Sequence, residues 1–241
     1  MSYLRASLPL LAALAFAASP LTTNGFRGFA PNQFPIPQID PPVQPAGYAF
    51  AIWGAIYLWL IAGAAYGLIR RADDPDWRPM RPALTLSIVL GAGWIPVAQI
   101  SPVWATAMIW AMLATAVWAL RRAGQADHWW LRAPVALYAG WLTAASCVAV
   151  GLLLAGHGVM GAQAAALTAL ALALAVALGV QSLRPDAPTY AIAVIWALAG
   201  VVVANLAPLN GPVVGVCAVG MAVVLLRAVR ARRPLAPARA T

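Results

Sequence analysis

The sequence predicts an all-α integral membrane protein with about eight transmembrane helices. Of the 241 residues, 63% are hydrophobic and only 9% are charged, whereas an ordinary soluble domain has about 25% charged residues. The mean hydropathy is +0.82. Apolar runs of nearly helix-spanning length recur along the chain, and a helix of about 20 residues crosses a bilayer core about 30 Å thick. The charged residues lie between these runs.

We expect eight membrane-spanning helices, with ends defined to within a few residues. From the N-terminus, the apolar runs cover Leu4–Leu21, Ala46–Ile69, Pro82–Ile100, Val103–Leu120, Ala133–Ala155, Val159–Val180, Thr189–Leu206 and Gly211–Leu226.

The arginines test this count independently, because basic residues are retained in cytoplasmic loops. All 15 basic residues are Arg, and the net charge is +9. If the N-terminus is cytoplasmic, eight spans place every Arg except Arg27 in a cytoplasmic segment. The positive charge therefore indicates topology, with both termini cytoplasmic, and gives no reason to expect a nucleic-acid partner.

The first apolar run has a second interpretation. The stretch "MSYLRASLPLLAALAFAAS" has a basic start, a short apolar core and small residues, as a cleaved signal peptide does. We favour retention because the apolar run continues through Pro20 and Leu21. Cleavage would not change the orientation of the later helices.

The side chains that usually carry catalysis or bind metals are sparse. Cys147 and Cys217 lie in separate apolar runs, so packing explains them better than a disulfide or a metal site. His128 and His157 lie far apart in loops. Apart from Arg5, no ionisable acid or base lies within a run, which disfavours a proton-coupled transporter and an acid-base enzyme. We therefore expect no enzyme, no catalytic residue and no metal site.

Residues 22–45, "TTNGFRGFAPNQFPIPQIDPPVQP", are unlike an ordinary solvated linker. They include six Pro and three Phe, and the prolines prevent a regular helix. Loops of this length in compact domains commonly act as lids or binding loops. We expect an external binding loop, with a poorly ordered connector as the alternative.

Large aromatic rings occur deep inside the runs as well as at their ends. Residues three and four apart share one face of a helix, so Phe50, Trp53 and Tyr57 form an aromatic ladder on the second run. Tyr138 and Trp141 repeat this spacing in the fifth run. Trp residues near span ends act as interfacial anchors, but a deeper indole needs a partner for its N–H. From the residues alone, interhelical packing and a ligand cavity both stay open.

These residues resemble the TspO/MBR family of tryptophan-rich sensory proteins, which includes the mitochondrial translocator protein. The resemblance rests on "PAGYAFAIWGAIYLWLIAGAAYGL", "GWIP", the Trp-rich fourth run and "LYAGWLTAAS". It covers about residues 1–155 and does not reach the last three runs. Ala149 departs from the family pattern, which typically has an Asn at that place.

The resemblance implies a TspO-like five-helix bundle in residues 1–158, with a pocket beneath the external loop 22–45. Three further transmembrane helices would occupy 159–228, and a basic cytoplasmic tail would occupy 229–241. The family binds tetrapyrroles such as porphyrin and haem, and also sterols. A membrane receptor or carrier for flat hydrophobic ligands is therefore expected, with a sensory or transport role in a bacterial inner membrane. Carried over residue by residue, the ligand-binding residues are Tyr48, Phe50, Trp53, Tyr57, Trp94, Trp110, Tyr138 and Trp141.

Other expectations concern partners and alternatives. Arg27 is the external cation that could contact an anionic group of the ligand. We expect no required cofactor, a tetrapyrrole as the ligand to test first, the lipid bilayer as the environment, and a homodimer as an open option. A facilitative transporter of another small solute and a structural partner of other membrane proteins are the alternative functions. Breaks at corresponding positions of two helices would favour the transporter. Only Pro96 and Pro208 are candidates for such breaks.

Overall fold

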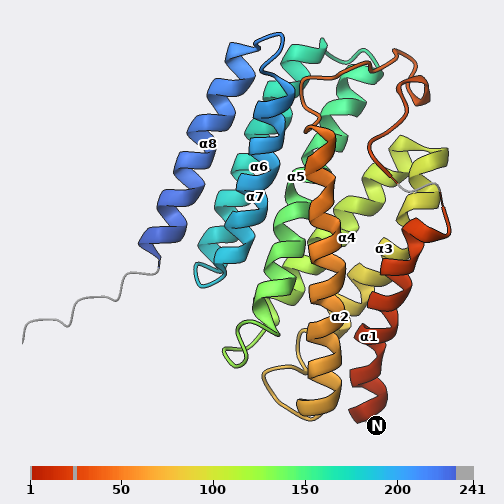
Figure 1. Cartoon of the computed structure of the whole chain (residues 1–241), viewed down its shortest axis with the longest axis vertical. Helices are drawn as coiled ribbons and strands as arrows, with labels where there is room; N and C mark the ends of the chain where they lie inside the picture. The colour runs from red at the N-terminus through yellow and green to blue at the C-terminus, as the bar shows by residue number, and fades with distance from the viewer. Residues whose placement is uncertain (1, 24–25, 232–241) are drawn as a thin grey trace, which may run out of the picture.

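The computed structural model describes residues 2–23 and 26–231, and the regular secondary structure in this part of the chain consists of helices joined by loops (Figure 1). The described residues form no β-strand and only one isolated bridge, between Leu206 and Leu209. The eight helices found there are α1 Ser2–Ala18, α2 Ile52–Arg70, α3 Arg81–Ile100, α4 Pro102–Arg122, α5 Arg132–Gly156, α6 Ala162–Leu183, α7 Pro188–Ala204 and α8 Gly211–Arg230.

Each of the eight predicted runs forms a helix, which confirms the all-α membrane fold. Among the described residues, seven helical segments are long and apolar enough to cross a membrane. The exception, α7, has 17 residues, at the lower end of the usual length of about 17–25 residues. The second run differs at its start, because Gly47–Ala51 form a 3₁₀ turn before α2. The sixth begins late, at Ala162, because Gly158 has a φ of +71° and Gly161 is extended.

Helix α5 lies at the centre of the molecule and contacts α2, α4, α6 and α7 (Figure 1). On one side of it, α1 packs against α2 and α3, and α3 packs against α4. On the other side, α8 covers α6 and α7. Because α5 has helices on both sides, its side chains are the most completely buried of any helix.

Helix α7 is hydrogen-bonded to the first five helices and the turn before α2. The Tyr190 hydroxyl lies 2.8 Å from Thr143 Oγ1 on α5. Since the Thr143 hydroxyl donates its single hydrogen to the Ala139 carbonyl, Tyr190 is the donor in this pair. The Trp196 indole donates to the carbonyl oxygen of Ala49 at 2.8 Å. Helix α7 therefore shares the core with the first five helices.

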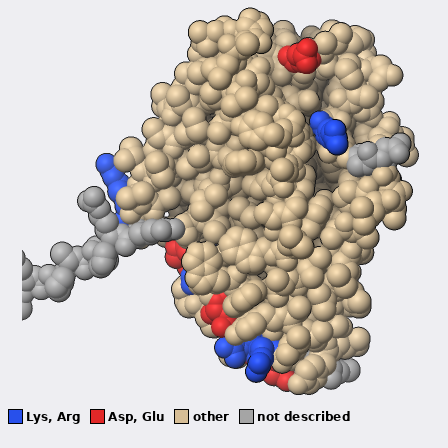
Figure 2. Space-filling view, in the orientation of Figure 1, with Lys and Arg blue, Asp and Glu red and all other residues tan. Residues whose placement is uncertain are grey.

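Most charged side chains on the visible face gather at its lower end, away from the long loop that joins α1 to α2 (Figure 2). Two ion-pair groups fasten the connections there. Asp127, between α4 and α5, pairs with Arg71 after α2. Asp186, between α6 and α7, pairs with Arg132 and Arg184.

Candidate ligand-binding cavity

The loop between α1 and α2 forms a folded cover over one end of the bundle. The Gln33 side chain donates to the carbonyl oxygens of Ala98 and Gln99 at the end of α3, at 2.8 and 3.1 Å. The Ile36 N–H donates to the carbonyl oxygen of Gly156, the last residue of α5, at 2.8 Å. These bonds hold the described part of the loop in place, which differs from the poorly ordered connector that was the alternative.

A second set of contacts ties the end of the loop to α7. Asn205 Nδ2 donates to the Pro42 carbonyl oxygen at 2.9 Å, and the Ala46 N–H donates to the Gly200 carbonyl oxygen at 3.0 Å. A side chain at position 200 would collide with Pro45 and Ala49, because a Cβ there would lie 2.9 Å and 2.8 Å from their Cβ atoms. Gly200 thus permits a close approach that positions the start of α2.

Beneath this loop lies a partly open cavity of about 410 Å³, which we call the aromatic cavity. Its walls come from α1, the loop, the 3₁₀ turn, α2, α3 and α4. The lining residues are Phe16, Pro20, Phe26, Arg27, Gly47, Tyr48, Phe50, Ala51, Trp53, Tyr57, Trp94, Ile95, Ile109 and Met112.

Five of the predicted ligand-binding residues line this cavity, and Arg27 joins them: Tyr48, Phe50, Trp53, Tyr57 and Trp94. Trp53 and Tyr57 stack with ring centroids 5.4 Å apart and an interplanar angle of 16°. This is the ladder expected from their spacing of four residues on α2. Trp94 is fixed by a 2.8 Å hydrogen bond from its indole to the Ala105 carbonyl oxygen.

Phe16 of α1 lines the aromatic cavity and contacts three other aromatic rings. Its ring makes edge contacts with Tyr57 at 4.9 Å, Trp53 at 5.6 Å and Tyr138 at 5.9 Å. The ring fits because position 91 is glycine: a Cβ there would lie 2.7 Å from a Phe16 ring carbon. The sequence pattern of the first run gave no sign of this role, since a single Phe among Ala and Leu is ordinary core composition.

A second, smaller cavity of about 70 Å³ adjoins the first on the side of α5, α6 and α7. Phe26, Phe50, Trp94 and Ile109 line both cavities, so these side chains form the wall between them. Trp141 lines only this smaller cavity. Its indole is 2% exposed, and its Nε1 has no hydrogen-bond partner among the described residues. It is therefore an unused buried donor next to the wall.

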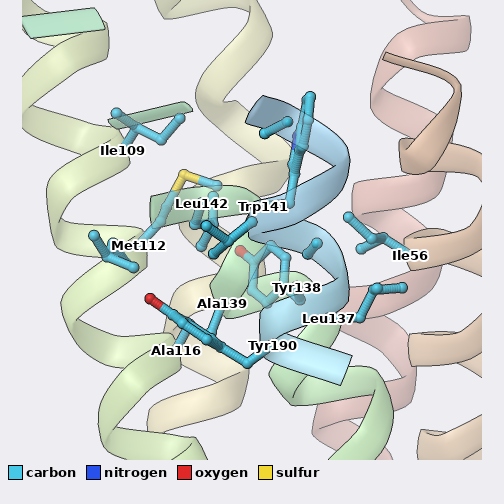
Figure 3. Close-up of a cluster of buried hydrophobic side chains, with 14 of the residues drawn as sticks. Ile56, Ile109, Met112, Ala116, Leu137, Tyr138, Ala139, Trp141, Leu142 and Tyr190 are labelled. Atoms are coloured by element: carbon cyan, nitrogen blue, oxygen red, sulfur yellow. The ribbon is translucent and has the colours of Figure 1, made fainter. Parts of the chain in front are cut away.

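The other two predicted residues do not line either cavity. Tyr138 is fully buried in the cluster around Trp141, Ile109 and Met112 (Figure 3). Its hydroxyl lies 3.1 Å from Ser87 Oγ, which itself donates to the Met112 carbonyl; Tyr138 therefore donates to Ser87 and joins α5 to α3. Trp110 is half-buried on α4 and packs against the core.

The loop supplies residues that the sequence interpretation did not include. Phe26 contacts Trp94 edge-on with centroids 4.6 Å apart, and Phe29 contacts Phe26 at 5.3 Å. The loop contains three Phe, but an irregular segment has no periodicity from which to infer which side chains point inward. Arg27 is exposed and lines the aromatic cavity, so it can contact an anionic group there.

The described residues contain no group of three metal-ligating side chains. Cys147 and Cys217 are both buried and free in the structure. Among the described residues that line the aromatic cavity, Arg27 is the only charged one. Its chemistry is therefore that of stacking and apolar contact, with one cation.

The comparisons with known proteins agree with this architecture. The sequence model of the family described as TSPO-like protein matches residues 35–230. The match includes the last three helices and omits α1. The resemblance seen in the sequence covers about residues 1–155, so the family match corrects these bounds at both ends. No curated protein and no solved structure matches the chain. Because the match covers most of the chain, the protein is a member of the TSPO-like protein family.

Proposed function

We propose that this membrane protein binds a flat hydrophobic ligand, a tetrapyrrole such as a porphyrin or haem or a sterol-like molecule, in the aromatic cavity. The observation that carries the proposal is that Trp53, Tyr57 and Trp94, together with Arg27, line one cavity of about 410 Å³. Pockets for small molecules have volumes of roughly 300–1,000 Å³ and are mostly apolar with a few polar groups. The role that follows is that of a receptor or carrier, and it includes no catalytic step.

The chemistry of the lining favours a ligand with extended flat faces. Indole and phenol rings prefer offset or edge contacts with other aromatic systems, in addition to the gain from burying apolar area. A porphyrin also carries propionate groups, and the Arg27 guanidinium can donate two hydrogen bonds to a carboxylate. The unused Trp141 indole lies beyond the wall, edge-on to Phe50 at 5.9 Å. A ligand group that displaced the Phe50 ring could accept its hydrogen bond.

The helices do not favour the transporter alternative. Transporter sites are commonly built from helices that are interrupted in the membrane. Helix α3 continues through Pro96 without interruption, and Pro208 lies in the connection between α7 and α8. In the part of the chain that the structure describes, neither proline creates the paired breaks that such a site needs.

The test is a titration of the purified protein with protoporphyrin, followed by quenching of Trp fluorescence. We expect a Kd near 1 μM, which corresponds to about −8.2 kcal/mol. Trp53→Ala should weaken binding about tenfold, because it removes one aromatic wall and its apolar contact area. Trp104→Ala is the matched control, since Trp104 is 71% exposed on α4 and lies outside the cavity.

Three outcomes distinguish binding in the aromatic cavity, binding elsewhere on the protein and no specific binding. If Trp53→Ala alone weakens binding, the ligand occupies the aromatic cavity. If both variants bind as the wild type does, the ligand lies elsewhere. If the wild type binds no better than empty detergent micelles, the tetrapyrrole proposal fails and a different solute has to be sought.

A further inference from the structure

A separate cavity lies at the opposite end of the membrane-spanning bundle from the loop. It has a volume of about 420 Å³ and lies between the end of α6, the turn into α7 and the last turn of α8. Figure 1 shows the end of α8 beside this turn. We call it the basic cavity. Its lining residues are Gln181, Ser182, Arg184, Pro185, Ala187, Pro188, Arg227, Ala228, Arg230 and Ala231.

Three arginines among the described residues line this cavity, and the charge of one of them is already neutralised. Arg184 donates to both oxygens of Asp186, at 2.9 and 3.1 Å, and to the carbonyl oxygens of Leu120 and Ala123. Burial alone would raise the pKa of Asp186, but the hydrogen bonds and charges of Arg184 and Arg132 outweigh it and lower this pKa to about 2. Asp186 is therefore ionised at neutral pH and already shared by two arginines.

The other two arginines have no carboxylate partner in the part of the chain that the structure describes. Arg227 and Arg230 are three residues apart on α8 and so share one face of the helix. Arg227 makes one hydrogen bond, from Nη2 to Ser182 Oγ at 2.7 Å. Neither residue takes part in the salt bridges of the described residues. Two unpaired guanidinium groups on one side of a cavity attract an anion with several oxygens, and Arg matches the geometry of phosphate particularly well.

A third group in the basic cavity also lacks a partner. Gln181 is 7% exposed. Its Nε2 donates to the Val224 carbonyl oxygen at 3.0 Å, but its Oε1 has no hydrogen-bond partner among the described residues. A buried acceptor without a donor costs stability. A ligand that combines a phosphate with a nearby hydroxyl or ammonium group would satisfy both the arginines and this oxygen.

The surroundings of the cavity indicate a lipid and not a free phosphate compound. Beside its lining residues in the sequence, Leu183 at the end of α6 and Leu226 and Val229 on α8 are each about half exposed, so apolar surface adjoins the arginines. Acyl chains can lie along this surface while the headgroup enters between the arginines. Basic pockets between helices at the membrane edge bind anionic headgroups in this way.

We propose that the basic cavity binds the phosphate of an anionic membrane phospholipid between Arg227 and Arg230, with a hydroxyl of the headgroup donating to Gln181. This site is independent of the aromatic cavity. Phosphatidylglycerol fits the description, because its phosphodiester carries one negative charge and its glycerol supplies hydroxyl donors.

The experiment is a titration of the purified, delipidated full-length protein in neutral detergent, followed by native mass spectrometry. Phosphatidylglycerol and phosphatidylcholine with identical acyl chains are compared. Phosphatidylcholine carries a choline cation beside its phosphate and has no headgroup hydroxyl, so the first phosphatidylglycerol should bind roughly tenfold or more tightly than phosphatidylcholine. Arg227→Gln/Arg230→Gln should remove this preference. The control is Arg121→Gln/Arg122→Gln, which removes two exposed arginines at the end of α4.

Each outcome decides the proposal. Loss of the preference in the α8 double variant alone supports it, and a further loss of about fivefold in Gln181→Leu supports the role of that oxygen. Equal losses in the α8 and α4 variants would show only general attraction of anions to basic residues, and would overturn the site. Displacement of the lipid by an equal concentration of soluble glycerophosphoglycerol would overturn the assignment to a lipid.

Discussion

Replacing Asp127 by Asn removes the charge at the centre of the network that joins the α4–α5 connection to α2. Asp127 accepts hydrogen bonds from Arg71 Nε at 2.7 Å and Nη2 at 3.2 Å, from Trp77 Nε1 at 3.0 Å and from the Tyr66 hydroxyl at 3.2 Å. Its φ is +49°, a region that Asn also tolerates. The substitution therefore keeps the backbone and the side-chain shape, and it changes the chemistry alone.

The expected cost follows from these contacts. The Asn amide presents one oxygen and one NH₂ group. At least one of the groups that donate hydrogen bonds to Asp127 would therefore face the NH₂ group, which is itself a donor. Hydrogen bonds to a charged group contribute about 1.5–3 kcal/mol each, but Arg71 is 36% exposed and water replaces part of its bond. We expect a net loss of about 2 kcal/mol. For a chain of this size, that lowers the Tm by about 4–8 °C, measured by intrinsic fluorescence in detergent.

The pH dependence supplies a second check. The hydrogen bond from Arg71 holds the pKa of Asp127 below its ordinary value, although burial acts in the opposite direction. A group with a lowered folded pKa stabilises the protein fully above its unfolded pKa, about 3.9, and loses this effect as pH falls through the folded pKa. The difference in Tm between wild type and Asp127→Asn should therefore be constant near neutrality and shrink below about pH 4. The exposed Asp73→Asn is the control. An unchanged Tm in Asp127→Asn at pH 7 would refute the reasoning.

Three further predictions concern the ligand, the C-terminal helices and topology. Arg27→Gln should weaken binding of protoporphyrin about fivefold but leave its neutral dimethyl ester unaffected; equal effects on both would exclude a contact with the propionates. Truncation after Gly158 should leave a membrane-inserted protein that binds more weakly, because the loop loses its bonds to α7; unchanged affinity in a binding titration would show that α7 does not position the loop. In a Cys-free background, a cysteine at Asn32 should react with an impermeant reagent in intact cells and one at Asp73 should not; the reverse labelling would invert the proposed orientation.

The sequence predicts the helices well because lipid leaves few alternatives. A segment that crosses a bilayer must satisfy its backbone hydrogen bonds internally, so long apolar runs become helices whatever their neighbours are. The ends are less determined. Phe50 lies in a 3₁₀ turn and not in the helix that the run suggested. Helix α6 starts three residues late because two glycines continue the connection before it.

The candidate site is predicted only in part, since helical spacing gives a face but not the partner that this face meets. Trp53 and Tyr57 share a face, and that face borders the aromatic cavity. Tyr138 and Trp141 share a face as well. However, the Tyr138 hydroxyl bonds to Ser87 in the core, whereas Trp141 lines the neighbouring cavity. Whether such a ring lies in the core or lines a cavity depends on the small residues of the helices that it meets, such as Gly91. A single sequence does not reveal which helices meet.

The role of the last three helices also depends on contacts between distant residues. Tyr190 and Trp196 are the only large rings between Val159 and Leu226. In the structure both rings reach the earlier helices, through Thr143 and Ala49. The family match through residue 230 agrees with a shared architecture. The boundary at residue 158 stays a prediction, which the truncation experiment addresses.

The central claim, that the ligand occupies the aromatic cavity, is tested most directly by an experimental structure of the protein with protoporphyrin bound. We expect ligand density beneath the loop, with the macrocycle in contact with Trp53 and Tyr57 and a propionate directed toward Arg27. Density on the lipid-facing surface of the helices, with the aromatic cavity filled only by its own side chains, would contradict it.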